Sequence, residues 1–467
     1  MTELRIVLVH YHLFPGGVTS VIRDGLLSLA LFGGWDQVRV EAVVGSTNGV
    51  DLFKKRLLAL SQGRLSINTH VNPALYYRNT PWPSRKSFDL DAEHIQKDLE
   101  RVIQQSTAQL LWAHNPTLGK NPALSSALFR LTQNHRALRV IYHLHDFAEC
   151  GRPANLEFLQ TCCPSGVLHE VYPAGPNITL ITLTESDRLR LLRAGYPSEA
   201  VVSLHNPVSV KTSSQPYSSS ERPLMEKSIQ AWADRRGFQF RRDAKWLLAP
   251  LRTIRRKNLL ESVLWLFLLE EHWNLLITLD GNSASEQPYA EFVKECIRQQ
   301  GLPAVVGLCG GVHPPVAYDR LYASSDLMIS SSVLEGFGLG FVESALMDKP
   351  LLGRDLPDVT QELRGLPRSG LYDSVRIPLD LREQSRLSEL YQRKMEEVAE
   401  KTRMALMDVE NTLSAMKKML GGRTVDFSFL DAPLQARIIR RMTDNGYRKD
   451  FKACNPHLIQ VIKTVQP

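Results

Sequence analysis

The chain has 467 residues, of which 43% are hydrophobic and 22% are charged, and its formal net charge is +7 at pH 7. This composition is typical of a globular protein, and the length exceeds what one core usually supports, so we expect two domains of roughly 200 residues each. The short apolar run at residues 6–9 and the most apolar later segment, residues 263–269, are too short to span a membrane, because a membrane-spanning helix needs about 20 apolar residues.

The positive charge favours anionic partners. Basic residues cluster at 235–236, 241–242, 252–257 and 437–441, and most of them are expected on the solvated surface. A phosphorylated acceptor or an anionic membrane face is compatible with this charge. Nucleic acid is not expected, because no basic and aromatic motif of a known nucleic-acid-binding module is present. The sequence leaves the oligomeric state open.

The N-terminal run and the cysteines indicate a cytoplasmic protein. Residues 1–9 place an acid ahead of a short apolar run and lack a cleavage pattern, so they are predicted to form a strand rather than a signal peptide. The six cysteines lack paired CxxC spacing, which predicts reduced thiols. A metal site formed by Cys162, Cys163 and His169 is not expected, because adjacent cysteines rarely chelate one tetrahedral ion. Peripheral contact with the inner membrane face is compatible with the surface charge.

Short β-rich runs alternate with helix-length spacers through the first 210 residues. The expected strands cover residues 5–9, 38–44, 110–113, 140–144, 179–183 and 201–204. Strands at this spacing predict a parallel sheet with helical crossovers. Residues 1–210 are therefore expected to form a Rossmann-like domain.

The chain then becomes rich in serine, proline and charge between residues 211 and 243, which predicts an interdomain linker. A second series of β-rich runs follows at residues 246–251, 275–279, 305–308 and 327–330. Each run is again followed by a helical stretch. We therefore expect a second Rossmann-like domain over residues 244–440.

The C-terminal part of the chain has helical periodicity. Apolar or semipolar positions recur at spacings of three and four residues from Val398 to Leu420, which predicts one long amphipathic helix with a packing role. The last segment, residues 441–467, is expected to pack back on the N-terminal domain. Together with the linker, this segment is the candidate hinge.

Two glycine-rich turns follow predicted strands. The first, HYHLFPGG at residues 10–17, ends in Gly16 and Gly17 just before a helix expected to start near Val18. Glycines at such a turn let backbone N–H groups meet a phosphate at a helix N-terminus, although a tight turn needs glycine for steric reasons alone. The local pattern leaves both interpretations open.

The second turn is SVLEGFGLGFVE at residues 332–343. If a helix begins near Gly338, Glu335 lies in the loop and Glu343 lies about one and a half turns inside the helix, facing the same side. Carboxylates accept strong hydrogen bonds from the hydroxyls of a diol. The stretch therefore combines acids that suit a sugar with amides that suit a phosphate.

A third stretch, APLRTIRRKNL at residues 249–259, ends a predicted strand and enters a helix. Arg252 and Lys257 lie five residues apart across this loop and could neutralise a diphosphate leaving group without a metal. Alone, such a cluster is usually part of the surface.

These three stretches, in this order and spacing, resemble the retaining nucleotide-sugar glycosyltransferases of GT-B fold, the large class typified by bacterial mannosyl and glucosyl transferases. The resemblance covers nearly the whole chain. It implies an α/β fold with two Rossmann-like domains whose parallel sheets face an interdomain cleft, plus long C-terminal helices.

The resemblance also implies roles for the residues of these stretches. Arg252 and Lys257 would hold the donor diphosphate, Glu343 the donor ribose, and Glu335 hydroxyls of the transferred sugar. The backbone of Gly336, Phe337, Gly338 and Leu339 would supply amides to the donor. Gly16 and Gly17 would close on the diphosphate from the other domain.

Two histidine-bearing stretches also match positions of the family. LWAHNP at residues 111–116 contains His114, which the resemblance places against the reacting sugar, with His145 of YHLHD close behind. A histidine after a strand is otherwise usually structural. His114, Arg252, Lys257 and Glu335 are therefore the expected catalytic residues.

Two positions depart from the family pattern. Asn206 of LHNPV is similar to the family's Pro-Asn-Gly stretch and is a candidate donor-binding residue, but Pro207 replaces the glycine. Asn258 follows Lys257 at a position where glycine is commoner. Both departures bear on the assignment to a subfamily and do not change the expected fold.

The expected reaction is transfer of a hexosyl unit from a nucleoside diphosphate sugar to an acceptor hydroxyl, with retention of configuration and without a cofactor or metal. Since no carboxylate is evidently placed as a nucleophile, attack on the face that the diphosphate leaves is favoured. The alternatives are a nucleotide-sugar epimerase, a noncatalytic nucleotide-sugar-binding regulator and, with Glu335 and Glu343 as its two acids, a glycosidase.

Overall fold

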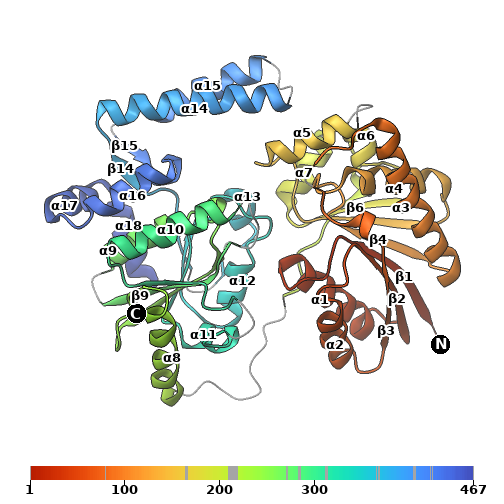
Figure 1. Ribbon diagram of the computed structural model, residues 1–467, viewed down its shortest axis with the longest axis horizontal. Helices are drawn as coiled ribbons and strands as arrows, with labels where there is room; N and C mark the ends of the chain where they lie inside the picture. The colour runs from red at the N-terminus through yellow and green to blue at the C-terminus, as the bar shows by residue number, and fades with distance from the viewer. Residues whose placement is uncertain are drawn as a thin grey trace. The chain divides into compact units, whose positions relative to one another are not determined.

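The computed structural model describes residues 2–78, 80–163, 167–208, 219–269, 272–281, 286–310, 314–363, 365–366, 369–402, 406–420, 422 and 424–465 (Figure 1). The chain forms two compact units. One comprises Met1–Ser209 with Met395–Val409, and the other comprises Val210–Lys394 with Glu410–Pro467.

The first unit is built on a seven-stranded sheet in the order β3-β2-β1-β4-β5-β6-β7. Every neighbouring pair of strands in it is parallel. The strands are β1 Glu3–His10, β2 Gln37–Val44, β3 Leu65–Val71, β4 Leu110–His114, β5 Arg139–Leu144, β6 Ile178–Thr182 and β7 Val201–Ser203. This is the Rossmann-like arrangement that the alternating pattern predicted.

Alternation along β1 shows why this sheet is covered on both faces. Leu4, Ile6 and Leu8 belong to one apolar core, and Val7 and Val9 belong to another. Successive side chains of a strand point to opposite faces, so both faces are buried. The surrounding helices are α1 Gly17–Phe32, α2 Val50–Leu60, α3 Arg85–Ser106, α4 Pro122–Asn134, α5 Pro153–Cys162, α6 Val167–Val171 and α7 Glu185–Arg193, with 3₁₀ turns η1 Pro73–Leu75 and η2 Ser198–Ala200.

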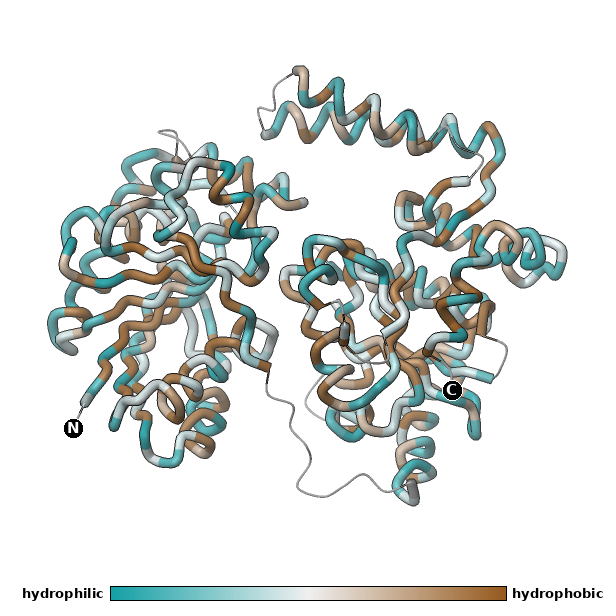
Figure 2. Tube along the Cα trace, turned by 180° about the vertical axis from the view of Figure 1, so that it is seen from behind, coloured by the Kyte–Doolittle hydropathy of each residue, from teal (hydrophilic) through white to brown (hydrophobic). Residues whose placement is uncertain are grey.

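The second unit has a six-stranded sheet in the order β10-β9-β8-β11-β12-β13, and its neighbouring strands are also parallel. The strands are β8 Lys245–Arg252, β9 Trp273–Leu279, β10 Ala304–Val306, β11 Leu327–Ser330, β12 Leu351–Arg354 and β13 Ser369–Tyr372. A separate antiparallel pair is formed by β14 Arg376–Pro378 and β15 Thr424–Asp426. In Figure 2 the strands of both sheets are hydrophobic over much of their length.

Helices of the second unit connect these strands and continue beyond them. They are α8 Arg222–Asp234, α9 Leu259–Leu268, α10 Gln287–Gln299, α11 Tyr318–Ser324, α12 Leu339–Leu346, α13 Pro357–Thr360, α14 Leu381–Thr402, α15 Leu406–Leu420, α16 Ala432–Arg441, α17 Asn445–Cys454 and α18 Pro456–Val465, with 3₁₀ turns η3 Ser219–Glu221, η4 Arg255–Lys257 and η5 Phe427–Phe429.

Strand order reverses direction between β1 and β4 in the first sheet and between β8 and β11 in the second. In open parallel sheets, ligands bind beyond the carboxyl ends of the strands at such a switch point. His10 and His114 end the two strands at the first switch point, and Arg252 and Ser330 end those at the second. Two of the sequence-predicted residues, His114 and Arg252, therefore lie at the strand ends where sheets of this kind bind ligands.

The expectation for residues 441–467 is corrected, because α17 and α18 lie in the second unit. Leu458, Ile462 and Val465 of α18 are buried in the core of that unit. Asn455, between the two helices, accepts a hydrogen bond from Arg376 N and donates one to Arg376 O, both at 2.7 Å. The apolar face of this segment therefore completes the core of the second unit.

The linker is shorter than residues 211–243. Residues 209–218 lie outside the described part of the chain, but residues 222–234 form α8 of the second unit. Met225, Ile229 and Trp232 face the same core as β8. Their helical spacing was obscured in the sequence by the surrounding charges.

The single long helix expected from Val398 to Leu420 is also wrong. The segment contains the end of α14 and the whole of α15, and these two helices lie side by side as an antiparallel hairpin in both views (Figures 1 and 2). A three-and-four spacing carried across a short connection does not distinguish one helix from two.

Among the described residues, no helix combines the length and apolar character needed to cross a bilayer.

Replacement of Gly370 tests the packing of the C-terminal helix. A Cβ atom at Gly370 in β13 would lie 2.8 Å from Val465 Cγ1 and 2.9 Å from Val461 Cγ1, both in α18. We expect Gly370→Ala to lower the free energy of unfolding by about 1–3 kcal/mol, because α18 must shift. Gly340→Ala is the matched control, since its nearest neighbour would be 3.9 Å away. Equal urea midpoints for the two variants would contradict this packing.

Candidate functional site

The predicted site residues of the two units are described separately. In the second unit they lie at or after the ends of β8 and β11, the strands at the switch point. In the first unit they lie at or after the ends of β1, β4, β5 and β7.

Lys257 and Glu335 form the centre of the group in the second unit. Lys257 Nζ donates a hydrogen bond to Glu335 Oε1, and each side chain is only 12% exposed. Arg256 supports the pair: its Nη1 lies 3.9 Å from Glu335 Oε2 and donates to Leu334 O at 3.0 Å. Burial alone would raise the pKa of Glu335, but the Lys257 ammonium and hydrogen bonds outweigh it, so the pKa is lowered. Glu335 is therefore ionised near neutral pH.

The turn that carries Lys257 is held by hydrogen bonds from neighbouring segments. Ser331 Oγ, at the end of β11, donates to Lys257 O at 3.0 Å. Asn258 has a left-handed backbone with φ of 50°. Its Nδ2 donates to Glu261 Oε2 at 2.8 Å, and its Oδ1 accepts from Gln435 Nε2 at 2.9 Å. Asparagine thus replaces the commoner glycine because it tolerates this backbone and adds two buried hydrogen bonds.

Glu261 links this turn to a buried ionic network. Arg354 Nη2 donates to Glu261 Oε2 at 2.6 Å, and Arg354 Nη1 donates to Asp426 Oδ2 at 2.8 Å. Burial opposes the charge of Arg354, but the two carboxylates outweigh it and raise the guanidinium pKa. The network joins α9, β12 and β15, so three distant segments hold the base of the turn.

The glycine-rich stretch forms the entry to α12, which begins at Leu339 as expected. Gly338 has a φ of 78°, and a Cβ atom there would lie 2.8 Å from Val359 Cγ1. Gly338 is therefore required for both its backbone conformation and the close approach of α13. The amides of Leu339 and Gly340 open the helix, where backbone N–H groups lack intrahelical acceptors.

Glu343 lies within α12 and accepts a hydrogen bond from the Tyr318 hydroxyl at 3.2 Å. Burial raises its pKa above the usual range for a glutamate, although the Tyr318 hydrogen bond partly opposes this effect. Tyr318 is 41% exposed, so its hydroxyl can be displaced by a competing donor. The two glutamates therefore differ: Glu335 is paired with a cation and Glu343 with a neutral hydroxyl.

Arg252 is held apart from this pair by a different acid. Its Nη1 lies 3.5 Å from Glu286 Oε1, and its side chain is about one-third exposed. Both predicted cations of the clamp thus contact acids in this structure. A bound diphosphate would have to compete with Glu286 for Arg252 and with Glu335 for Lys257.

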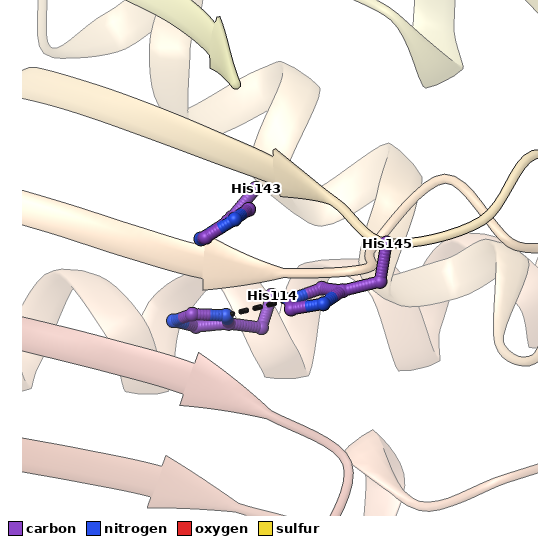
Figure 3. A group of neighbouring side chains, drawn as sticks. All are labelled: His114, His143 and His145. Atoms are coloured by element: carbon purple, nitrogen blue, oxygen red, sulfur yellow. Dashed lines mark hydrogen bonds between the residues drawn. The ribbon is translucent and has the colours of Figure 1, made fainter. Parts of the chain in front are cut away.

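Histidines dominate the group in the first unit (Figure 3). His114 ends β4, and its Nδ1 is hydrogen-bonded to His145 Nε2 at 3.0 Å. His10 Nδ1 donates to His114 O at 3.0 Å. Burial, assisted by the neighbouring histidines, holds the pKa values of His114 and His145 well below normal, and it lowers that of His10 to about 3. These rings are therefore neutral.

His143 completes this cluster. Its ring stacks on His145, with centroids 4.5 Å apart and planes inclined by 22°. One ring nitrogen from each of His114, His143 and His145 lies within 4.8 Å of the others, so the three side chains could hold a metal ion. Burial lowers the pKa of His143 to about 4.

The remaining candidates of the first unit lie apart from these contacts. Gly16 precedes α1 and lines a small pocket with Thr19, Ser20, Arg23 and Arg56, and Gly17 is the first residue of α1. Asn206 is buried, and its Oδ1 has no hydrogen-bond partner among the described residues.

Sequence reasoning missed three contributors to these groups. Tyr318 begins a short helix with no motif around it. Glu286 is separated from Arg252 by 34 residues in the sequence, so no spacing pattern links the two. His143 had a usable signal: its spacing of two from His145 in YHLHD places both side chains on the same side of an extended chain.

No protein-family model matches the chain. It is 29% identical over 462 residues, 98% of this chain and 85% of the relative, to mannosylglucosyl-3-phosphoglycerate synthase of Petrotoga mobilis. A glycosyltransferase from Rickettsia africae has a TM-score of 0.54 at 13% identity, covering 95% of this chain and 100% of that one. Anabaena HepE in complex with UDP-glucose has a TM-score of 0.50 at 15% identity, covering 94% and 99%.

These comparisons confirm the resemblance to glycosyltransferases of GT-B fold that the sequence predicted. The chain has the GT-B architecture of two Rossmann-like domains, and it is similar over nearly its whole length to a glycosyltransferase.

Replacement of Asn258 tests how the Lys257 turn is held. Asn258→Gly removes two buried hydrogen bonds but keeps the left-handed backbone accessible. Asn258→Ala removes the same bonds and adds a strain of about 1 kcal/mol, so we expect it to be the less stable variant in urea unfolding. Asp243→Ala is the control, since Asp243 is exposed and also has a positive φ, of 58°. Equal stability of Asn258→Ala and wild type would contradict this account.

Proposed function

We propose that the protein is a retaining glycosyltransferase that moves a hexosyl unit from a nucleoside diphosphate sugar to an acceptor hydroxyl. The observation that carries this proposal is the Lys257–Glu335 pair beside the N-terminus of α12, at the switch point of the second sheet. A cation, helix amides and an ionised acid together suit a diphosphate joined to a sugar.

Groups of the bound donor would replace several of the side-chain contacts described above. Its diphosphate would take Lys257 and the opening amides of α12, with Arg252 released from Glu286. Ribose hydroxyls would replace the Tyr318 hydroxyl on Glu343. Glu335, kept ionised by its cationic neighbours, would accept a hydrogen bond from a hydroxyl of the transferred sugar.

These contacts would favour departure of the diphosphate. Negative charge grows on the leaving oxygen in the transition state, and fixed cations and amides stabilise it without reorganisation. Glu335 accepts a hydrogen bond from Lys257, and Glu343 accepts one from Tyr318. We therefore assign both acids to positioning the donor and not to nucleophilic attack. Attack from the face that the diphosphate leaves would retain the configuration.

The first unit is assigned to the sugar and acceptor side. The resemblance assigns His114 to the reacting sugar, supported by His145. It assigns Gly16, Gly17 and Asn206 to donor contacts. The ring nitrogen Nε2 of His114 is buried without a partner among the described residues, which supports its use by a hydroxyl.

The acceptor is proposed to be anionic. The product named for the Petrotoga relative carries 3-phosphoglycerate, and this chain has a net charge of +7. Arg23 and Arg56 line the small pocket beside Gly16. A phosphate or carboxylate on a small acceptor suits this charge.

The reaction is tested with a panel of nucleoside diphosphate sugars in thermal-shift assays. Stabilising donors are then incubated with 3-phosphoglycerate, its glycosides and neutral sugars, and products are analysed by mass spectrometry and NMR. We expect one donor class, an anionic acceptor and a product with the anomeric configuration of the donor. An inverted product would contradict retention, and isomerised donor without transfer would indicate an epimerase. Donor binding without any reaction would indicate a noncatalytic binding protein.

Substitution of Lys257 tests the diphosphate contact. Loss of one preorganised charge contact costs about 3–4 kcal/mol of transition-state stabilisation, so Lys257→Ala should lower kcat on the order of a hundredfold or more. Arg242→Ala, which removes an exposed cation of the same unit, should leave kcat unchanged.

The double variant Lys257→Ala/Glu335→Gln separates charge balance from catalysis. Lys257→Ala alone removes the closest cation from the buried Glu335 and leaves Arg256 Nη1 at 3.9 Å, which destabilises the site. Glu335→Gln removes that orphaned charge, so the double variant should be more stable than Lys257→Ala but equally inactive. Recovery of kcat in the double variant would show that Lys257 merely neutralises Glu335.

A further inference from the structure

The histidine cluster of the first unit contains buried polar atoms that nothing described in the chain satisfies. Both ring nitrogens of His143 and Nε2 of His114 are buried without a hydrogen-bond partner among the described residues. A neutral imidazole has one N–H and one lone pair, and leaving either of them buried and unsatisfied destabilises the fold. Orphaned atoms of this kind indicate a ligand or an internal water.

The sheet brings the three rings to one place. His114 and His143 are direct partners in the parallel pairing of β4 with β5, so their side chains project from the same face. His145 follows two residues later, and its ring joins the other two (Figure 3). Trp112 lies against His143, with ring planes inclined by only 5°.

The nitrogens are close to the spacing of metal ligands. They lie within 4.8 Å of one another, whereas nitrogens around a tetrahedral zinc ion are separated by about 3.4 Å at Zn–N distances of about 2.0–2.1 Å. The rings of His114 and His145 are inclined by 32°, so modest rotations must turn their lone pairs to a common centre. His143 is free of hydrogen bonds that oppose such a rotation, among the described residues.

We propose that His114, His143 and His145 bind one divalent transition-metal ion of the zinc class, with a fourth position open to water. Three imidazoles plus an open position form a common donor set for zinc. Imidazole nitrogen suits Zn²⁺, Co²⁺, Ni²⁺ and Cu²⁺, whereas Mg²⁺ and Ca²⁺ require oxygen ligands.

The ion would act as an inhibitor of the transferase. This consequence rests on the proposed function, because it requires His114 to contact the reacting sugar. Coordination would engage the ring of His114 and break its hydrogen bond to His145. Binding of the ion itself does not depend on the reaction.

Cobalt binding by the full chain tests the site. Protein treated with a chelator is titrated with Co²⁺, and uptake is followed by visible absorption and by equilibrium dialysis with metal analysis. We expect one equivalent of Co²⁺, displaced by Zn²⁺ and not by Mg²⁺. The spectrum should lack the near-ultraviolet thiolate band that binding to any of the six free cysteines would produce.

His143→Phe is the critical variant, since it keeps a ring against Trp112 and His145 but removes the ligand. It should lose the Co²⁺ equivalent while retaining the wild-type melting temperature. If this variant fails to fold, His143→Gln serves, because it removes the imidazole and leaves a hydrogen-bonding group. Uptake well below one equivalent by wild type would overturn the site and indicate an internal water instead. Undiminished uptake by either folded variant would also overturn the site, because the ion would then be bound by other residues.

Activity separates this proposal from the proposed function. Zn²⁺ should inhibit sugar transfer by wild type severalfold more than transfer by His143→Phe. Metal uptake without any transferase activity would refute the proposed function and leave the site standing. Transferase activity without metal uptake would refute the site alone.

Discussion

The buried ion pair between Lys257 and Glu335 is the constraint on which the second unit's site depends. Each side chain is 12% exposed, and two charges removed from water are tolerated only when good geometry and further hydrogen bonds compensate the desolvation. Those supports come from segments far apart in the sequence. Ser331 holds the Lys257 carbonyl, and Asn258 joins the turn to Glu261 and Gln435. A ligand that took the place of one member of the pair would therefore bind to a side chain that is already held in position.

Both groups of candidate residues exist because parallel strands change order at one point in each sheet. Apolar alternation buries both faces of β1, which leaves only the strand ends available for polar chemistry. The first unit presents neutral histidines there, and the second presents charged pairs. The two groups differ in charge because of what surrounds the buried side chains. Among the described residues, His114 is buried beside other histidines, whereas Glu335 is buried beside the cation of Lys257. Each unit thus offers a different chemistry on the same scaffold.

The sequence predicted the central strands and the placement of its candidate residues at the strand ends and turns, because strong apolar runs and glycine turns are local patterns. It missed β3, whose Asn68 and His70 alternate with apolar residues, and β12, a four-residue strand containing Arg354. It also misplaced the C-terminal helices, since the face that an amphipathic helix covers is set by tertiary packing. The partners Glu286 and Tyr318 could not be predicted, because contacts between side chains distant in sequence leave no spacing pattern.

The most direct test of the central claim is a crystal structure with the nucleoside diphosphate that gives the largest thermal shift. The account predicts that a phosphate oxygen accepts hydrogen bonds from Lys257 Nζ and from an amide in the first turn of α12. The ribose hydroxyls should bind Glu343 in place of the Tyr318 hydroxyl. A diphosphate bound elsewhere, with Lys257 still paired only to Glu335, would contradict it.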